Sequence, residues 1–190
     1  MIYAVRHGET DWNAEGKIQG QSETNLTQKG IAQAEGLREE FKDIKFDAVF
    51  CSPLVRTKDT CKIIVGDNIN INYEPCLMER DFGVMTGKVD NFMLFWNLKK
   101  PKTAKNLETI EEMEKRIFPF MEGIVNKYAG KNVLIVTHQG PLFIMENFFG
   151  YKPDDGNYLL HFLHGGGYRI YNEKTKEKTE YGLNPTGFSG

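Results

Sequence analysis

Short apolar runs alternate along this chain with longer amphipathic segments. Runs of β-branched and aromatic residues that end at glycine or polar residues are typical of buried strands. They predict strands over the following ranges: Ile2–Val5, Phe46–Cys51, Ile69–Tyr73, Val133–Val136, Tyr158–Leu163 and Tyr168–Tyr171. Between these runs, apolar residues recur at helical spacing. That spacing predicts helices over the ranges Gln28–Phe41, Ser52–Ile64, Val89–Leu98, Thr109–Tyr128 and Gly140–Phe149.

Capping and proline residues refine these helices. Thr27 and Thr109 suit N-cap positions, because a threonine hydroxyl can accept a hydrogen bond from an unpaired N–H of the first turn. Pro119 lies within the long helix, where its missing N–H and its ring should kink or break the helix. From Asn172 onward the composition becomes polar, so we expect residues 172–190 to form a loose tail.

The alternation of strands and helices predicts the fold class. It favours an α/β three-layer sandwich, which is a mostly parallel sheet with helices on both faces. The chain has 190 residues, and no repeat, low-complexity block or linker divides it. We therefore expect residues 1–190 to form a single domain that can bury a proper core.

Composition narrows the classes of function. Hydrophobic residues make up 40% and charged residues 26% of the chain, and the net charge is −2. This balance gives no reason to expect a nucleic-acid or membrane partner. Cys51, Cys61 and Cys76 form no metal-binding or disulfide pattern, so we expect reduced thiols. No apolar run is long enough to span a membrane, and the N-terminal run is too short for a signal peptide, so we expect a cytoplasmic protein.

Three predicted strands end in residues that can carry chemistry. Arg6 and His7 follow the first strand, Arg56 lies one helical turn beyond the second, and His138 follows Val133–Val136. If these strands are parallel, the three segments share the edge of the sheet where ligands bind in open α/β folds. A cation beside a possible nucleophile suits a phosphate ester. Taken alone, an Arg-His-Gly tripeptide is equally well explained as a turn with a partly buried histidine.

Four segments in chain order carry a more specific pattern. They are Arg6-His7-Gly8-Glu9-Thr10 with Asn13, followed by Ile18-Gln19-Gly20 and Leu26-Thr27-x-x-Gly30; Ser52-Pro53-Leu54-x-Arg56-Thr57; Leu77-x-Glu79-x-x-Phe82-Gly83; and Val136-Thr137-His138-x-Gly140. Together they resemble the motifs of the histidine phosphatase superfamily, the phosphoglycerate mutase-like proteins. The resemblance spans most of the chain and implies the phosphoglycerate mutase-like fold.

The resemblance implies a covalent mechanism that uses three residues. His7 would attack phosphorus and become a phosphohistidine, since an unprotonated imidazole is a competent nucleophile. His138 would donate to the transferring group from across the phosphate. Glu79 would protonate the leaving oxygen and then take a proton from the attacking water. Without the resemblance, Glu79-Arg80-Asp81 is explained as a solvated charge cluster, and Asp81 is a rival for the acid role.

The resemblance also implies a phosphate site without a metal or other cofactor. Six residues would bind the phosphoryl oxygens: Arg6, Arg56, Asn13, Gln19, Gly20 and Gln139. The two arginines supply forked donors that match those oxygens. His161 and His164 match no motif, and the four histidines show no metal-binding spacing. The expected partner is a small phosphorylated metabolite.

The sequence leaves three functions open. The first is a phosphatase acting on a small phosphomonoester such as a sugar phosphate, a ribazole phosphate or phosphoserine. The second is a cofactor-dependent phosphoglycerate mutase, but family mutases carry a longer basic insertion than Lys88–Leu107, whose basic residues are lysines. The third is a non-catalytic phosphate-binding module, which would not need the acid Glu79. Departures from the family pattern at Gln21, Thr86 and Gln139 bear on the shape of the substrate.

Overall fold

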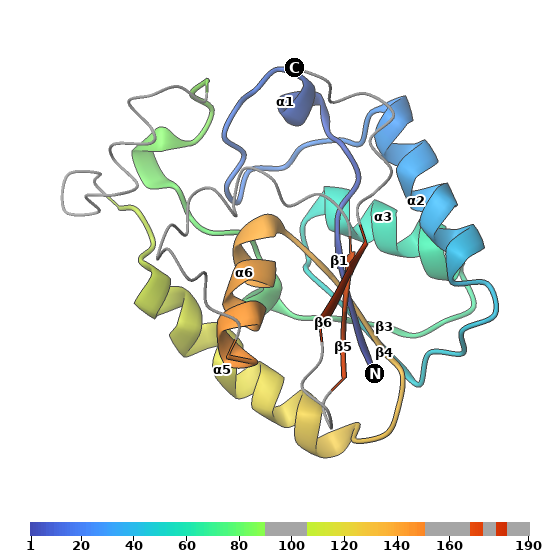
Figure 1. The fold of residues 1–190 in the computed structure, drawn as a ribbon. Helices are drawn as coiled ribbons and strands as arrows, with labels where there is room; N and C mark the ends of the chain where they lie inside the picture. The colour runs from blue at the N-terminus through green and yellow to red at the C-terminus, as the bar shows by residue number, and fades with distance from the viewer. Residues whose placement is uncertain (90–105, 151–167, 173–177, 182–190) are drawn as a thin grey trace.

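The computed structural model describes residues 1–89, 106–150, 168–172 and 178–181, and Figure 1 shows their arrangement. In chain order the elements are β1 (Ile2–Arg6), α1 (Asp11–Ala14), α2 (Gln28–Glu40), β2 (Ala48–Cys51), α3 (Val55–Val65), β3 (Ile71–Tyr73), the 3-10 helices η1 (Pro75–Leu77) and η2 (Gly83–Met85), α5 (Ile110–Lys127), β4 (Val133–Thr137), α6 (Gln139–Phe148), β5 (Tyr168–Tyr171) and β6 (Lys178–Tyr181).

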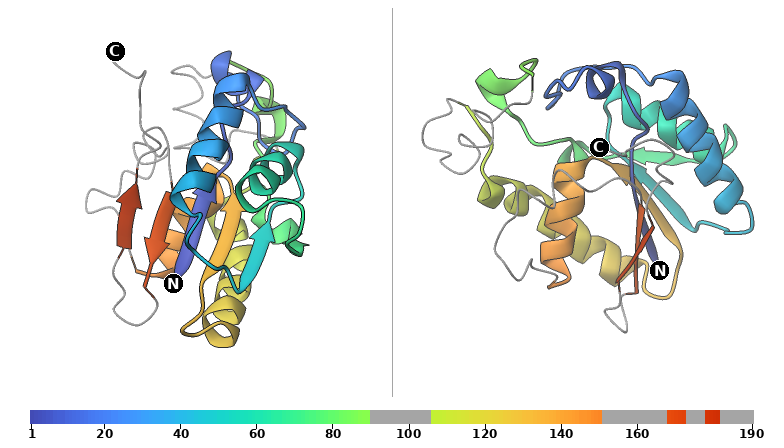
Figure 2. Two further views of the ribbon diagram at one scale, coloured as in Figure 1. Left: turned by 90° about the vertical axis from the view of Figure 1, so that its right-hand side faces the viewer. Right: turned by 45° about the horizontal axis from the view of Figure 1, so that its top comes forward.

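The described strands form a six-stranded sheet in the order β3-β2-β4-β1-β5-β6. The pairs β3–β2, β2–β4 and β4–β1 are parallel, whereas β5 is antiparallel to β1 and β6 is antiparallel to β5. The left view of Figure 2 shows the strands side by side, with helices in front of and behind them. The predicted α/β fold with a mostly parallel sheet is confirmed.

Alternate strand residues point into two hydrophobic cores, because successive side chains of a strand lie on opposite faces of the sheet. Ala4 and Ile135 belong to the core formed with α5 and α6. Val5 and Val136 belong to the core formed with α2 and α3. The sheet is therefore the middle of three layers, and the predicted helices on both faces are confirmed (Figure 1).

Two expectations about chain continuity are corrected. The expected break at Pro119 does not occur, since α5 runs as one helix from Ile110 to Lys127. Pro119 and Lys115, whose carbonyl loses its helical partner, are both exposed, so water can satisfy that carbonyl. The apolar stripe of α5 keeps the helix on the sheet across this point, through Met113, Ile117, Met121 and Ile124.

The polar segment after Asn172 is not simply a loose tail. Residues 178–181 form β6, which pairs with β5 at the edge of the sheet. Backbone hydrogen bonding, rather than apolar composition, is what an edge strand needs, so the polar composition misled the prediction. The predicted strand Tyr158–Leu163 and, apart from Val89, the predicted helix Val89–Leu98 lie outside the described residues.

The register of the central strands brings their carboxyl ends level. Cys51 of β2 is paired with Val136 of β4. The ladders continue one residue further, because the His7 N–H donates to the Thr137 carbonyl oxygen at 3.0 Å and the Ser52 N–H donates to the Val136 carbonyl oxygen at 3.0 Å. The segments that follow β1, β2 and β4 therefore begin side by side at one edge of the sheet.

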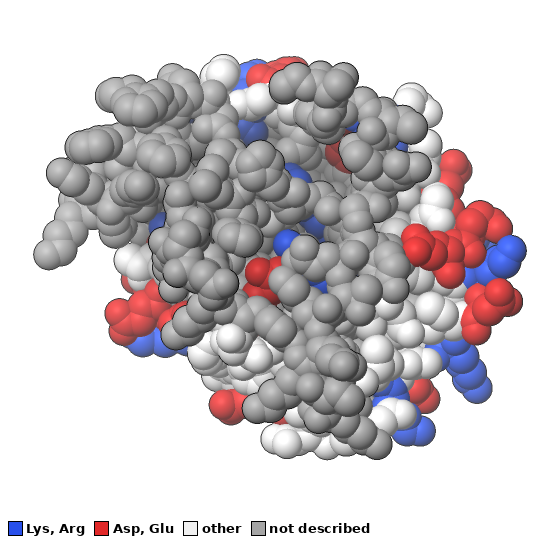
Figure 3. All heavy atoms as spheres, in the orientation of Figure 1, with Lys and Arg blue, Asp and Glu red and all other residues white. Residues whose placement is uncertain are grey.

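The described surface carries charges of both signs. Figure 3 shows acidic and basic side chains next to one another along the right-hand edge of the molecule, in keeping with the net charge of −2. Within the described ranges, no helix is long and apolar enough to cross a membrane.

A close backbone contact joins α2 to the turn after β1. A Cβ at Gly30 would lie 2.0 Å from the Glu9 carbonyl oxygen, and a Cβ at Gly8 would lie 2.3 Å from the Gly30 carbonyl oxygen. Backbone atoms cannot move aside as the end of a flexible side chain can. Glycine at both positions therefore allows α2 to approach the turn that carries His7.

We predict that Gly30→Ala lowers the free energy of unfolding by about 1–3 kcal/mol, because the added methyl group overpacks this contact. Gly36, which is exposed in the same helix, is the matched control, since a Cβ there meets nothing within 4 Å. Gly36→Ala should raise the free energy of unfolding by about 0.5–1 kcal/mol. Urea denaturation measures both variants, and equal effects at the two positions would contradict the close contact.

Candidate active site

His7 is the first residue beyond β1, and its side chain is buried. Its Nδ1 lies 2.7 Å from the carbonyl oxygen of Gly8. A carbonyl oxygen can only accept, so Nδ1 carries the proton of the neutral ring and Nε2 keeps its lone pair. The turn is also held from α3, because the Gly8 N–H donates to Thr60 Oγ1 at 3.1 Å. These contacts orient His7 with Nε2 as its potential nucleophilic atom.

His138 is the N-cap residue of α6 and is fully buried. Its ring meets that of His7 edge to face, with 5.2 Å between the ring centroids. Its Nε2 lies 2.8 Å from Ser52 Oγ, and its Nδ1 is buried without a hydrogen-bond partner among the described residues. When the Ser52 hydroxyl donates to Nε2, the proton of the neutral ring is on Nδ1. Nδ1 is then a buried donor that lacks an acceptor among the described residues.

Arg56 lies in the first turn of α3, and its side chain is fully buried. Its Nη2 donates to the Gly20 carbonyl oxygen at 2.7 Å, and its Nη1 donates to the Ser22 carbonyl oxygen at 2.7 Å. The guanidinium therefore holds the loop that contains Gly20 and Ser22. Its Nε is buried without a hydrogen-bond partner in the part of the chain that the structure describes. A buried unpaired donor costs about 1–3 kcal/mol, which an anionic ligand would offset.

Arg6 is the last residue of β1. It lies on the same face of the sheet as Ala4, which is the face covered by α5 and α6. Burial lowers the pKa of Arg6, the charge of Glu79 raises it and the charge of Arg169 in β5 lowers it. The charge of Arg6 also acts on His7. These interactions place Arg6 near His7 and Glu79.

Glu79 lies between η1 and η2, and its side chain is buried. Its Oε1 accepts from the Arg80 N–H at 2.8 Å and from the Gly140 N–H, in the first turn of α6, at 3.0 Å. A Cβ at position 140 would lie 2.4 Å from Glu79 Oε1, so glycine there lets the carboxylate reach the helix N-terminus. Since both backbone donors are committed to Oε1, Oε2 is the atom that can carry and transfer a proton.

Asp81, the rival for the acid role, has a different environment. It is exposed, and its Oδ1 accepts from the Gly83 N–H at 2.8 Å, which closes a turn. An exposed carboxylate that closes its own turn is a structural part of the loop. The geometry therefore favours Glu79 as the titrating acid.

Burial is the main electrostatic factor at this site. It lowers the pKa of His7 well below the ordinary value, and the charges of Arg6 and Arg56 lower it further. The pKa of His138 is likewise well below the ordinary value, again chiefly through burial. Burial raises the pKa of Glu79, which backbone N–H groups and the two arginines only partly offset. The site thus combines two neutral imidazoles with a carboxyl group that retains its proton to higher pH.

Asn13 and Gln19 each have an amide oxygen that is already engaged. Asn13 Oδ1 accepts from the Thr10 N–H at 3.2 Å, as part of the capping box of α1. Gln19 Oε1 accepts from the Thr24 hydroxyl at 2.6 Å. The NH₂ group of each remains a potential donor. The described hydrogen bonds of the Asn13 side chain are with Thr10, so they do not tie it to the histidines.

The remaining predicted residues have simpler positions. Gly20 supplies its carbonyl oxygen to Arg56 and has a φ of 51°, in the region that favours glycine. Gln139 is buried as the first residue of α6. His161 and His164 lie outside the described residues. Within the described ranges, no group of three or more His, Cys, Asp or Glu residues is arranged to hold a metal ion.

Three site contacts were missed by reasoning from the sequence. Ser52 contacts His138, Thr60 holds the backbone beside His7, and the Gly140 N–H binds the Glu79 carboxylate. Ser52 and Gly140 lie inside recognised motifs, so their positions at element ends were a usable signal. Thr60 is inside a helix, and the pattern of apolar residues assigns it no role.

The fold agrees with comparisons to known proteins. The chain belongs to the histidine phosphatase superfamily (branch 1), whose family model matches residues 2–178. It is 33% identical over 160 residues to a metal-independent phosphoserine phosphatase of Arabidopsis thaliana, covering 74% of this chain and 65% of that one. It is 44% identical over 148 residues to a probable phosphoglycerate mutase, GpmB, of Enterobacter sp. (strain 638), covering 73% and 69%. The structure of the alpha-ribazole phosphatase from Shigella flexneri matches with a TM-score of 0.75 at 26% identity, covering 96% and 95%.

We predict that His7 and His138 remain neutral at pH 6, because both have pKa values well below the ordinary value near 6.5. His7 should be the Nδ1–H tautomer, since Nδ1 donates to the Gly8 carbonyl. Long-range ¹H–¹⁵N NMR of ¹⁵N-histidine-labelled protein reports both features, with His7→Asn and His138→Asn variants for assignment. Titration of either ring near pH 6.5 would contradict the described burial.

Proposed function

We propose that this protein is a metal-independent phosphatase that hydrolyses a small phosphomonoester through a phosphohistidine at His7. The observation that supports this most strongly is the environment of His7. Its pKa is lowered by burial, its Nδ1 is committed to a backbone carbonyl, and Arg6 and Arg56 are nearby. A neutral imidazole with a free Nε2 beside two guanidinium groups suits attack on a phosphate dianion.

The first half-reaction transfers the phosphoryl group to the protein. Nε2 of His7 forms a bond to phosphorus while the bond from phosphorus to the ester oxygen breaks. Glu79 gives its proton from Oε2 to that oxygen, so the product leaves as a neutral alcohol. Arg6, Arg56 and the Nδ1–H of His138 stabilise the charge on the equatorial oxygens, as phosphoryl transfer requires.

The second half-reaction regenerates the protein. The Glu79 carboxylate accepts a proton from water while the water oxygen bonds to phosphorus and the bond from phosphorus to Nε2 breaks. Inorganic phosphate leaves, His7 is neutral again and Glu79 is again protonated. Gln19, Gly20, Asn13 and Gln139 complete the proposed phosphate site. The NH₂ groups of Gln19 and Asn13 would be its neutral donors.

The proposed substrate is a small phosphomonoester, and the second candidate reaction is that of a phosphoglycerate mutase. Relatives in the family have names that indicate phosphoserine phosphatase, alpha-ribazole phosphatase and phosphoglycerate mutase activities. We favour hydrolysis because Lys88–Leu107 is short and has no arginine, whereas a mutase must shield its phosphohistidine from water. A panel of small phosphomonoesters that includes 3-phosphoglycerate separates the two reactions. A phosphatase releases phosphate, whereas a cofactor-dependent mutase whose histidine has first been phosphorylated by a bisphosphoglycerate returns the 2-phospho isomer without release.

We predict that His7→Ala reduces turnover to the background rate and abolishes acid-labile labelling by a ³²P-phosphomonoester, because the variant lacks the proposed acceptor of the phosphoryl group. Glu79→Gln is the matched control, since ³²P-labelled p-nitrophenyl phosphate should still label it and it should lose this label more slowly. Chelators should leave wild-type activity unchanged. Wild-type activity in His7→Ala, or strict dependence on added metal, would falsify the mechanism, and the absence of any label on the wild type would favour a binding module.

We predict that Glu79→Gln lowers kcat/KM by about 10²–10⁴-fold for alkyl phosphates and far less for p-nitrophenyl phosphate. The reason is that an alkoxide needs a proton in order to leave, whereas nitrophenolate largely does not. The parameter kcat/KM reports the phosphorylation of His7 alone, so a slow second half-reaction does not obscure the comparison. Asp81→Asn is the control, and it should lower kcat/KM only slightly for every leaving group. A loss that depends on the leaving group in Asp81→Asn alone would move the acid role to Asp81.

A further inference from the structure

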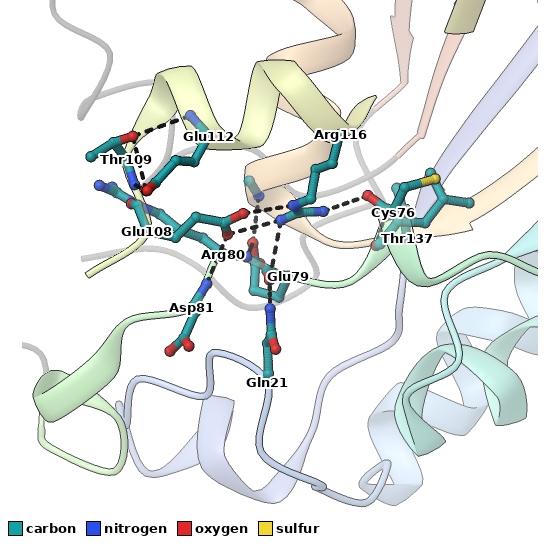
Figure 4. Close-up of polar contacts among 12 residues, drawn as sticks. Gln21, Cys76, Glu79, Arg80, Asp81, Glu108, Thr109, Glu112, Arg116 and Thr137 are labelled. Atoms are coloured by element: carbon teal, nitrogen blue, oxygen red, sulfur yellow. Dashed lines mark hydrogen bonds and ion pairs between the residues drawn. The ribbon is translucent and has the colours of Figure 1, made fainter. Parts of the chain in front are cut away.

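The segment that carries Glu79 is held by one side chain of α5 (Figure 4). Arg116 donates from Nη1 to the Cys76 carbonyl oxygen and from Nη2 to the Glu79 carbonyl oxygen, the latter at 3.4 Å. The guanidinium thus bridges two carbonyls at either end of residues 76–79. One of them belongs to the proposed acid itself.

Glu108 holds both this guanidinium and the same segment. Its Oε1 lies 2.6 Å from Arg116 Nε, and its Oε2 lies 3.0 Å from Arg116 Nη2. Oε2 also accepts from the Asp81 N–H at 3.0 Å, and the Glu108 carbonyl oxygen accepts from Arg80 Nε at 2.7 Å. The side chain of Glu108 is 14% exposed and that of Arg116 is 21% exposed. A bidentate, largely buried pair of this kind fixes orientation as well as charge.

The start of α5 fixes Glu108 in turn. Thr109 Oγ1 accepts from the Glu112 N–H at 3.1 Å, and Glu112 Oε2 accepts from the Thr109 N–H at 2.7 Å, which forms a capping box. Helix α5 is anchored to the hydrophobic core by Met113 and its other buried residues. The segment that carries the acid is therefore connected to the core through Glu108 and Arg116.

Other contacts restrict the same segment from different elements. Gln21 Nε2 donates to the Glu79 carbonyl oxygen at 3.1 Å, and Thr137 Oγ1 donates to the Leu77 carbonyl oxygen at 2.7 Å. The carboxylate is bound at its far end by the Gly140 N–H. Both the carbonyl oxygen and Oε1 of Glu79 are therefore held by hydrogen bonds. Because of this, the position of the Glu79 backbone determines the direction in which Oε2 points.

We propose that Arg116, held by Glu108, is a positioning residue for acid–base catalysis by Glu79. By fixing the carbonyls of Cys76 and Glu79, it sets the orientation of Oε2 toward the leaving oxygen. The inference rests on the proposed role of Glu79 in the phosphatase reaction. Proton transfer needs a separation between heavy atoms of about 2.6–3.2 Å, so a small shift of the segment affects this step before it affects phosphate binding.

An arginine suits this role and a lysine does not. The planar guanidinium contacts Glu108 through Nε and Nη2 while Nη1 and Nη2 reach two carbonyl oxygens. A lysine ammonium is a single point from which these four directions cannot be met together. Arg116→Lys therefore retains the positive charge beside Glu108 but releases part of the segment.

The experiment compares Arg116→Lys, Glu79→Gln and the double variant over a series of leaving groups. We expect Arg116→Lys to lower kcat/KM for alkyl phosphates by about 10²-fold, a loss typical of a misplaced catalytic group, with a far smaller loss for p-nitrophenyl phosphate. In the Glu79→Gln background, Arg116→Lys should add no further dependence on the leaving group, because its effect passes through Glu79. Lys115→Gln is the matched control on α5, because Lys115 forms an exposed ion pair with Glu111. This variant should leave kcat/KM unchanged for every leaving group in the series.

Each alternative result has a distinct meaning. Equal losses across the series in Arg116→Lys, or losses that add fully to those of Glu79→Gln, would show a merely structural role and overturn the inference. A Glu79→Gln variant without dependence on the leaving group would instead overturn the acid assignment on which the inference rests. Thermal melting and circular dichroism check folding. If Arg116→Lys does not fold, Glu108→Gln takes its place in the series, since it keeps the shape of the partner and should produce the same selective loss.

Discussion

The parallel register of β1, β2 and β4 is the constraint on which the site depends. Pairing of Cys51 with Val136, continued by the backbone bonds of His7 and Ser52, makes three strands end at one level. The residues that follow these strands therefore meet without any long loop having to fold over the sheet. Apolar side chains on both faces fix this register, because a slip of one residue would exchange the two cores.

Burial then turns these neighbouring residues into a site with defined protonation. The pKa of His7 falls and the pKa of Glu79 rises for the same reason, since each loses water around its charged form. In the proposed mechanism, the first effect keeps His7 unprotonated as the nucleophile, and the second favours the protonated form of Glu79 that donates to the leaving oxygen. The charges of Arg6 and Arg56 reinforce the first effect and oppose the second, so their placement near His7 bears on its protonation state.

Much of the fold and part of the site could be predicted from the sequence. The strands Ile2–Val5 and Val133–Val136 are uniformly apolar, and short apolar runs of this kind are typical of buried strands. The strand β6 and the unbroken helix through Pro119 were not predicted, because backbone pairing and packing overrode local composition. The role of Arg116 was not predicted either, since nothing in the sequence distinguishes an arginine in a polar part of a helix from an ordinary surface residue.

The central claim is that Nε2 of His7 is the nucleophile because Nδ1 is committed to the Gly8 carbonyl. The most direct test is to phosphorylate Glu79→Gln protein, denature it in alkali and identify the phosphorylated atom by peptide mapping and ³¹P–¹H NMR. The account predicts a single phosphohistidine at position 7 with phosphorus on Nε2. Phosphorus on Nδ1 of His7, or on any other side chain, would contradict it.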